Sequence, residues 1–208
     1  VATDGRNAIV GIPMTSAASE NLNNYQGSVA IYSRTKYGKW SYPIELKCTN
    51  GETEAFGWSV DSATTQIMST NFVIGAPGNP FFGHDKTPGR AFVATTTGNP
   101  NGLSMKELVV DFNPLEMHQD PFMKYGDTFG ASVAIAGTTK QVIAVGAPGR
   151  TVDGQDRSGG VYLFAQDSQT GNWIHIDYLP CPAAQADYRF GSKVDLVERA
   201  GDYLLTVF

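Results

Sequence analysis

Two short motifs alternate along the chain, and this alternation constrains the fold more than any other feature. A Phe-Gly pair occurs three times, at Phe56-Gly57, Phe129-Gly130 and Phe190-Gly191. A Gly-x-Pro triplet also occurs three times, at Gly11-Ile12-Pro13, Gly75-Ala76-Pro77 and Gly146-Ala147-Pro148. The two series interleave, with one copy of each in every stretch of about 60 to 70 residues, and such regular spacing indicates a structural repeat of that length.

Each repeat contains four short apolar segments that are typical of β-strands. In the repeat that begins at Phe129 they cover residues 132–136, 141–145, 160–164 and 173–179. They are rich in Val, Ile, Tyr and Phe and are bounded by turn-forming residues, whereas no stretch of useful length has helical periodicity. Four antiparallel strands per repeat, arranged around an axis, predict the blade of a β-propeller. The alternative, a β-sandwich with accidental repeats, is disfavoured by the strict alternation of the motifs.

On these Phe-Gly and Gly-Ala-Pro motifs the chain resembles the FG-GAP repeat proteins, whose blades build the β-propeller of integrin α-subunits. The resemblance extends over essentially the whole chain. It implies an all-β fold of four-stranded antiparallel blades. It also implies an extracellular or cell-surface protein that takes part in adhesion or binds protein or glycan partners. Members of the family often hold Ca²⁺ in the loop between the first two strands of a blade.

The strand pattern predicts an incomplete ring of about three blades. The expected units are residues 1–47 (second to fourth strands), 56–111, 129–180 and 190–208 (first two strands), which gives thirteen strands. Closed propellers have about four to eight blades, and open sheet edges pair readily with other chains. We therefore expect the ring to be completed by the rest of the polypeptide or by another chain, and the segment alone to be aggregated, oligomeric or poorly folded.

The loops that carry Ca²⁺ in the family lack the required ligands here. Asp61 is the only acid between Phe56 and Gly75, and there is none between Phe129 and Gly146. Since Ca²⁺ takes about six to eight oxygen ligands, we predict no metal in these loops and no cofactor. Glu198 and Asp202, in the corresponding loop of the last unit, leave a weaker metal alternative open.

Catalytic motifs are also missing from the sequence. Asp61 and Asp195 each lie five residues after a Phe-Gly phenylalanine, where the unit between them has Ala134. Two carboxylates can serve as acid and base, but these come from units that are not neighbours, so we expect them to lie apart and to line a wet channel. His175, between Ile174 and Ile176 on the outermost strand of its blade, is predicted to face solvent. A carbohydrate-active enzyme is therefore disfavoured, and the chain is not expected to be an enzyme.

Long loops between the second and third strands of each blade are the predicted interaction surface. They cover residues 14–26, 78–88 and 149–158, and the predicted partner-binding residues in them are Tyr25, Phe81, Phe82, His84, Asp153, Asp156 and Arg157. Loops on a rigid scaffold frequently carry function, and aromatic residues with a charged rim suit a protein interface. Alternatively, Phe81 and Phe82 fold back over their own blade.

Charge and hydropathy exclude two classes of partner. The net charge is −5 and no basic stripe is present, so nucleic acid is not an expected partner. No apolar run approaches the roughly 18 residues of a membrane-spanning helix. The prediction is thus an extracellular or surface interaction module, with a structural component of a multi-chain assembly as the alternative.

Overall fold

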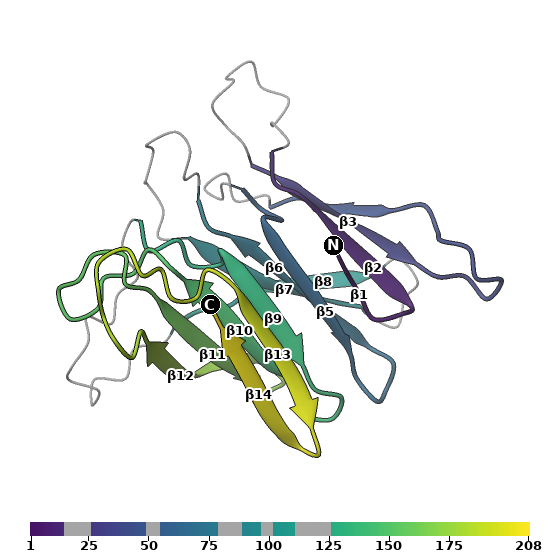
Figure 1. Ribbon diagram of the computed structural model, residues 1–208. Coiled ribbons are helices and arrows are strands. Elements are labelled where there is room, and N and C mark those ends of the chain that lie inside the picture. The colour runs from purple at the N-terminus through teal and green to yellow at the C-terminus, as the bar shows by residue number, and fades with distance from the viewer. Residues whose placement is uncertain (15–25, 49–54, 79–88, 97–101, 111–125) are drawn as a thin grey trace.

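The structure is a computed structural model that describes residues 1–14, 26–48, 55–78, 89–96, 102–110 and 126–208. In that part of the chain all regular structure is β, with fourteen strands in four antiparallel sheets (Figure 1). Three sheets have four strands and the last has two, and the sheets do not close into a ring. The expectation of an all-β, partial β-propeller is therefore confirmed.

The strands follow one another across each sheet in chain order. The first sheet contains β1 (Ala2–Thr3), β2 (Asn7–Ile12), β3 (Ser28–Ser33) and β4 (Ile44–Leu46). The second contains β5 (Ser59–Thr64), β6 (Thr70–Ala76), β7 (Arg90–Thr96) and β8 (Leu103–Glu107). The third contains β9 (Ser132–Ala136), β10 (Val142–Ala147), β11 (Gly160–Gln166) and β12 (Trp173–Pro180). The fourth contains β13 (Val194–Arg199) and β14 (Asp202–Val207).

The strand count corrects one prediction, since the first sheet was expected to lack its inner strand. Strand β1 supplies it, with Ala2 opposite Ile9 and Thr3 opposite Ala8. A strand of two residues, such as β1, is too short to show the alternation of apolar and polar side chains by which strands are recognised. The described chain therefore has fourteen strands rather than thirteen, and its first sheet has an inner strand.

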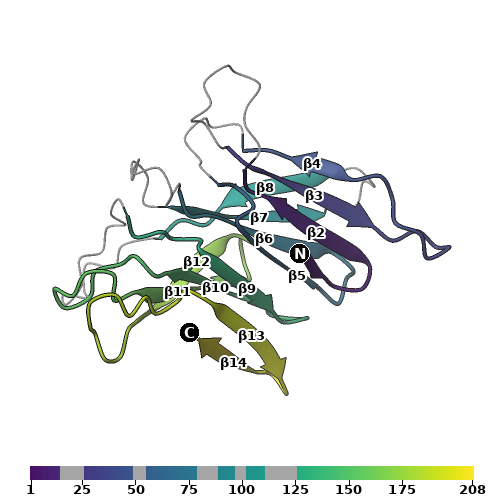
Figure 2. The same cartoon turned by 45° about the horizontal axis from the view of Figure 1, so that its top comes forward.

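The first strands of the sheets, β1, β5, β9 and β13, lie side by side along the inner edge of the arc. Figure 2 shows the sheets fanning outward from this edge. Because neighbouring strands are antiparallel, the short β1–β2, β3–β4, β5–β6, β9–β10 and β13–β14 connections share one end of the sheets, here called the hairpin face. The β10–β11 connection (148–159) and the β12–β13 connection (181–193) lie at the other end, here called the loop face.

Apolar cores fill the spaces between successive sheets. Phe56 is fully buried in the core between the first two sheets, where its ring meets Phe92 edge to face at 5.4 Å. Phe129, 2% exposed, occupies the same place in the next core, and Phe190 is half-buried in the third. The prediction that Phe56 and Phe129 are buried between blades is confirmed.

A contact between glycines explains why the two motifs alternate. The Cα of Gly75 lies directly against the carbonyl oxygen of Gly130, and Gly146 lies in the same way against Gly191. The carbonyl oxygen of Gly130 also accepts a hydrogen bond from Ser59 Oγ (2.8 Å). Each Gly-x-Pro glycine therefore packs against the Phe-Gly glycine of the next sheet, so the backbones approach more closely than any side chain would permit.

We expect Gly75→Ala to destabilise the fold. The added Cβ would lie far inside van der Waals contact with the Gly130 carbonyl oxygen, which is backbone and cannot rotate away. Overpacking of this kind costs about 1–3 kcal/mol or more in the free energy of unfolding, measured by urea denaturation. The control is Gly154→Ala, where open space surrounds the Cβ and only the left-handed backbone (φ +74°) opposes it. A loss for Gly75→Ala no larger than the control would contradict the tight contact.

The prediction that His175 faces solvent is wrong. The His175 side chain on β12 packs against two aromatic rings of β11, with its ring centre 5.6 Å from that of Tyr162 and 5.5 Å from that of Phe164. Its neighbours Ile174 and Ile176 are exposed instead. The imidazole packs at a tilt against the two aromatic rings of β11, and this packing decides which side of the outermost strand faces inward.

Candidate interaction surface

The described part of the loop face consists of two connections that lie side by side. Three backbone N–H groups of the β12–β13 connection donate to carbonyl oxygens of the β10–β11 connection, each at 2.9 Å: Asp187 to Asp156, Arg189 to Arg157 and Phe190 to Ser158. The two segments are thus joined as a short ladder. We call this unit, residues 150–158 with 185–190, the loop platform.

The tip of the loop platform is a tight turn. Asp153 and Gly154 both have left-handed backbone conformation, with φ of 51° and 74°. Val152 and Gln155 exchange backbone hydrogen bonds of 2.8 and 3.2 Å across this turn, and the Val152 side chain is buried. An Asp-Gly pair suits such a turn because both residues tolerate positive φ, so the sequence itself fixes the loop shape and presents Asp153 to solvent.

The predicted charged residues gather on this platform. Arg157 Nε lies 2.7 Å from Asp187 Oδ1, and both side chains are more than half exposed. Asp156 accepts a hydrogen bond from the Thr151 hydroxyl (3.2 Å). An exposed ion pair contributes only about 0–1 kcal/mol to stability, so these charges are available to a partner at little cost to the fold.

The structure describes only part of the predicted partner-binding set. Asp153, Asp156 and Arg157 come together, whereas Tyr25, Phe81, Phe82 and His84 lie outside the described residues. Sequence reasoning missed Asp187 and the 54%-exposed Tyr188, both on the platform. The sequence could have indicated both residues, because the connection between consecutive blades lies on the same face as the β10–β11 loop.

A buried ion pair anchors the base of the platform. Arg150 Nη1 donates to Asp127 Oδ2 at 2.7 Å, and both side chains are about 95% buried. The guanidinium carbon lies 5.9 Å from the ring centre of Tyr162 and 5.5 Å from that of Tyr178. Burial alone would lower the pKa of Arg150, but Tyr162 and Asp127 raise it above its usual value. Arg150 therefore remains charged and joins the start of the loop to the residues that precede β9.

The two channel carboxylates lie closer together than predicted. Asp61 and Asp195 line one cavity of about 400 Å³ at the inner edge, because β5 and β13 both flank β9 there. Asp61 Oδ2 accepts the N–H of Ile135 and Oδ1 that of Ser62, both at 2.8 Å. Burial nevertheless raises the pKa of Asp61 above 3.8. Asp61 Oδ2 thus joins β5 to β9 of the neighbouring sheet, whereas Oδ1 bonds within its own strand. In the described residues no three His, Cys, Asp or Glu side chains form a metal-binding group.

Two asparagines at equivalent positions of the first two sheets, near the hairpin face, are a second feature that sequence reasoning missed. Asn71 Nδ2 donates to Gln141 Oε1 on the next sheet, while its Oδ1 accepts from Thr95, both at 2.5 Å. Asn7 Nδ2 donates to Thr70 Oγ1 on the next sheet at 2.9 Å. Each asparagine stands four residues before a Gly-x-Pro glycine, so the motif could have been read as Asn-x-x-x-Gly-x-Pro in the first two units.

Asp4 makes stability depend on pH in a predictable direction. Burial by itself raises the pKa of its carboxyl, but hydrogen bonds from the Thr64 and Thr70 hydroxyls and from the N–H groups of Asn7 and Arg6 lower it below 3.8. Since the folded pKa is below the unfolded one, this stabilisation is present above the unfolded pKa and disappears as pH falls through the folded pKa.

We therefore expect wild type to exceed Asp4→Asn in free energy of unfolding at about pH 6, and the difference to shrink at about pH 2.5. Urea titrations of both proteins at the two pH values measure it. A difference that is constant or grows on acidification would show that the Asp4 carboxylate is not stabilised by folding.

A family model described as an FG-GAP repeat matches residues 124–164. A comparison with curated proteins gave no match. The matched segment includes β9, β10 and most of β11, and with them Phe129-Gly130 and Gly146-Ala147-Pro148, the motif pair whose glycines make the contacts between sheets. The described part of the chain has no helix with the length and hydropathy that a membrane crossing requires. The third sheet is thus built on an FG-GAP repeat, and the described residues together form a partial β-propeller.

Proposed function

We propose that the chain is a non-catalytic interaction module of an extracellular or cell-surface protein, and that it binds a protein partner through the loop platform. The observation that carries this proposal is the hydrogen-bonded ladder between the two connections, which holds charged and aromatic side chains in a fixed arrangement at the surface. A platform that is ordered before binding loses less conformational entropy when a partner docks, so more of the contact energy appears as affinity.

The chemistry of the platform is that of a polar protein interface. The platform carries the exposed residues Asp153, Asp156, Arg157 and Tyr188, and aromatic residues with Arg are enriched at interface centres. Beneath them, the Arg150–Asp127 pair makes the base of the loop rigid. These features favour recognition of a partner that itself carries mixed charge.

The non-catalytic part of the proposal rests on the inner cavity. Both oxygens of Asp61 accept backbone hydrogen bonds, one from its own strand β5 and one from β9, and these bonds fix the carboxylate in place. Asp195 lines the same cavity but is exposed to solvent. This arrangement supports a structural role for Asp61 between β5 and β9.

The test is binding of the labelled intact protein to the surface of cells from its source organism, measured by flow cytometry. The variant Asp153→Lys/Arg157→Glu/Tyr188→Ala should bind about tenfold more weakly, because it reverses two platform charges and removes the aromatic ring. The control is Glu45→Lys/Lys47→Glu, which exchanges an exposed ion pair at the end of β4. Equal binding by the platform variant and wild type would refute the platform as the interaction surface.

A further inference from the structure

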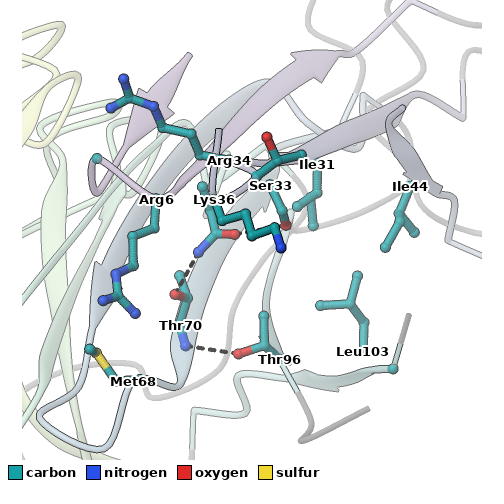
Figure 3. Close-up of a pocket in the computed structure, with 14 residues that line it drawn as sticks. Arg6, Ile31, Ser33, Arg34, Lys36, Ile44, Met68, Thr70, Thr96 and Leu103 are labelled. Atoms are coloured by element: carbon teal, nitrogen blue, oxygen red, sulfur yellow. Dashed lines mark hydrogen bonds between the residues drawn. The ribbon is translucent and has the colours of Figure 1, made fainter. Parts of the chain in front are cut away.

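A groove lies on the hairpin face between the first and second sheets, at the opposite end of the sheets from the loop platform (Figure 3). Its volume is about 520 Å³, within the range of small-molecule sites. Its walls come from the β1–β2 turn, the β3–β4 hairpin, the β5–β6 turn and the facing ends of β7 and β8. Residues from four separate connections and strand ends therefore converge on one hollow.

The mouth of the groove is cationic although the chain as a whole is acidic. Arg6, Arg34 and Lys36 line it, and among the described residues none of the three forms an ion pair with a carboxylate. Figure 3 shows the Lys36 ammonium directed toward Ile44 and Leu103, and Arg6 extending toward Met68. Arg34 instead turns toward its own hairpin, where its Nε donates to the Gly38 carbonyl oxygen (3.3 Å).

The neighbouring acid does not neutralise these cations. The Asp4 carboxylate accepts hydrogen bonds from the backbone N–H groups of Arg6 and Asn7 and from two threonine hydroxyls. By contrast, other arginines of the described chain have carboxylate partners, as Arg90 has Glu107 and Arg157 has Asp187. Among the described residues no carboxylate therefore offsets the charge of Arg6 or Lys36, and the Lys36 ammonium also lies 5.0 Å from the ring centre of Tyr37, outside the groove lining.

The inner wall is polar and held in place, and the floor is apolar. Thr70 N donates to Thr96 Oγ1, and Asn7 Nδ2 donates to Thr70 Oγ1, both at 2.9 Å. Ile44 and Leu103 are half-buried beside these groups and leave an apolar surface open to the groove. The groove thus has hydrogen-bonding groups on one side, aliphatic carbon on the other and cations at its mouth. These three surfaces are complementary to the hydroxyl groups, the C–H face and the anionic group of an acidic sugar.

We propose that this groove binds an acidic saccharide, with its sulfate or carboxylate at the mouth that Arg6 and Lys36 line and the C–H face of its ring against Ile44 and Leu103. Guanidinium and ammonium groups bind oxyanions through charge-assisted hydrogen bonds, which are stronger than neutral ones. The volume of the groove exceeds that of a lone inorganic anion and accommodates a sugar ring. The site is distinct from the loop platform and does not depend on it.

Isothermal titration calorimetry on the intact protein tests the proposal. The probes are 6-sulfated and sialylated N-acetyllactosamine, with unmodified N-acetyllactosamine as the neutral reference. At about 50 mM salt at least one acidic sugar should bind about tenfold more tightly than the neutral one, and the preference should weaken as salt rises. Arg6→Ala and Lys36→Ala should each weaken that binding about three- to tenfold.

Two variants make the test specific to the groove. Lys39→Ala, which removes an exposed cation of the same hairpin that does not line the groove, should bind as wild type does. Ile44→Arg adds positive charge but fills the floor, so it should abolish binding if the groove itself is the site. Thermal unfolding of each variant establishes that it is folded.

Three results would overturn the proposal. The first is that the neutral sugar binds as tightly as both acidic sugars, or that none of the three sugars binds. The second is displacement by inorganic sulfate at the concentration at which the sulfated sugar binds, which would mean an adventitious ion only. The third is retention of binding by Arg6→Ala, Lys36→Ala and Ile44→Arg. The platform variant Asp153→Lys/Arg157→Glu/Tyr188→Ala should bind the sugar normally, so failure of the proposed function and failure of the groove are distinguishable.

Discussion

Replacement of Phe129 by alanine is expected to lower the free energy of unfolding by about 3–5 kcal/mol. The ring is 2% exposed and packs edge to face on Tyr162 at 5.4 Å and on Phe164 at 6.2 Å. The backbone on both sides of Phe129 is fixed, because Thr128 and Gly130 both have positive φ and Gly130 is held against Gly75. The space left by the ring therefore cannot collapse, and the full cost of a cavity remains.

Phe190→Ala is the matched control for this prediction. Phe190 occupies the same motif position but is only half-buried, so its truncation removes less apolar surface from water and should cost less. Urea denaturation of both variants measures the two losses. A larger loss for Phe190→Ala than for Phe129→Ala would mean that the core between the second and third sheets is not the stronger one.

Asp127→Ala is expected to cost about 3–5 kcal/mol as well, for an electrostatic reason. The substitution leaves the Arg150 guanidinium buried without its carboxylate, and the surrounding tyrosine rings replace only part of that interaction. The guanidinium does not escape the cost by losing its proton, because arginine stays charged in proteins. Chemical denaturation at neutral pH measures the loss.

The double variant Asp127→Ala/Arg150→Met separates charge from packing. Methionine keeps much of the aliphatic stem against Tyr162 and Tyr178 but carries no charge, so the double variant should be more stable than Asp127→Ala alone. A double variant that is less stable than the single one would show that packing of the arginine, rather than compensation of its charge, dominates at this site.

Much of the fold could be predicted because each strand is a local pattern. The strand expected at residues 132–136 is β9 with the same bounds, and those expected at 160–164 and 173–179 are each extended slightly in β11 and β12. These segments combine β-branched and aromatic residues with turn residues at both ends. The buried positions of Phe56 and Phe129 followed from the same repeat.

The features that could not be predicted depend on contacts between segments that are distant in sequence. Asp61 and Asp195 line one cavity because the inner strands converge. The spacing of the two residues along the chain gives no information on the curvature of the arc. Arg6 and Lys36 reach one groove from separate turns, and each alone resembles an ordinary surface cation. The orientation of His175 was missed because alternation of side chains defines the two faces of a strand but not which face packs against neighbouring rings.

The glycine contact between sheets has a consequence for how such a chain can change over generations. The junction is made by backbone atoms and two residues without side chains, with the same arrangement at Gly75–Gly130 and Gly146–Gly191. A unit that carries both glycines and keeps the apolar core residues between the sheets therefore fits other units that do the same. Whole blades can be duplicated, deleted or exchanged in register, while the surfaces at their two ends diverge to recognise different molecules.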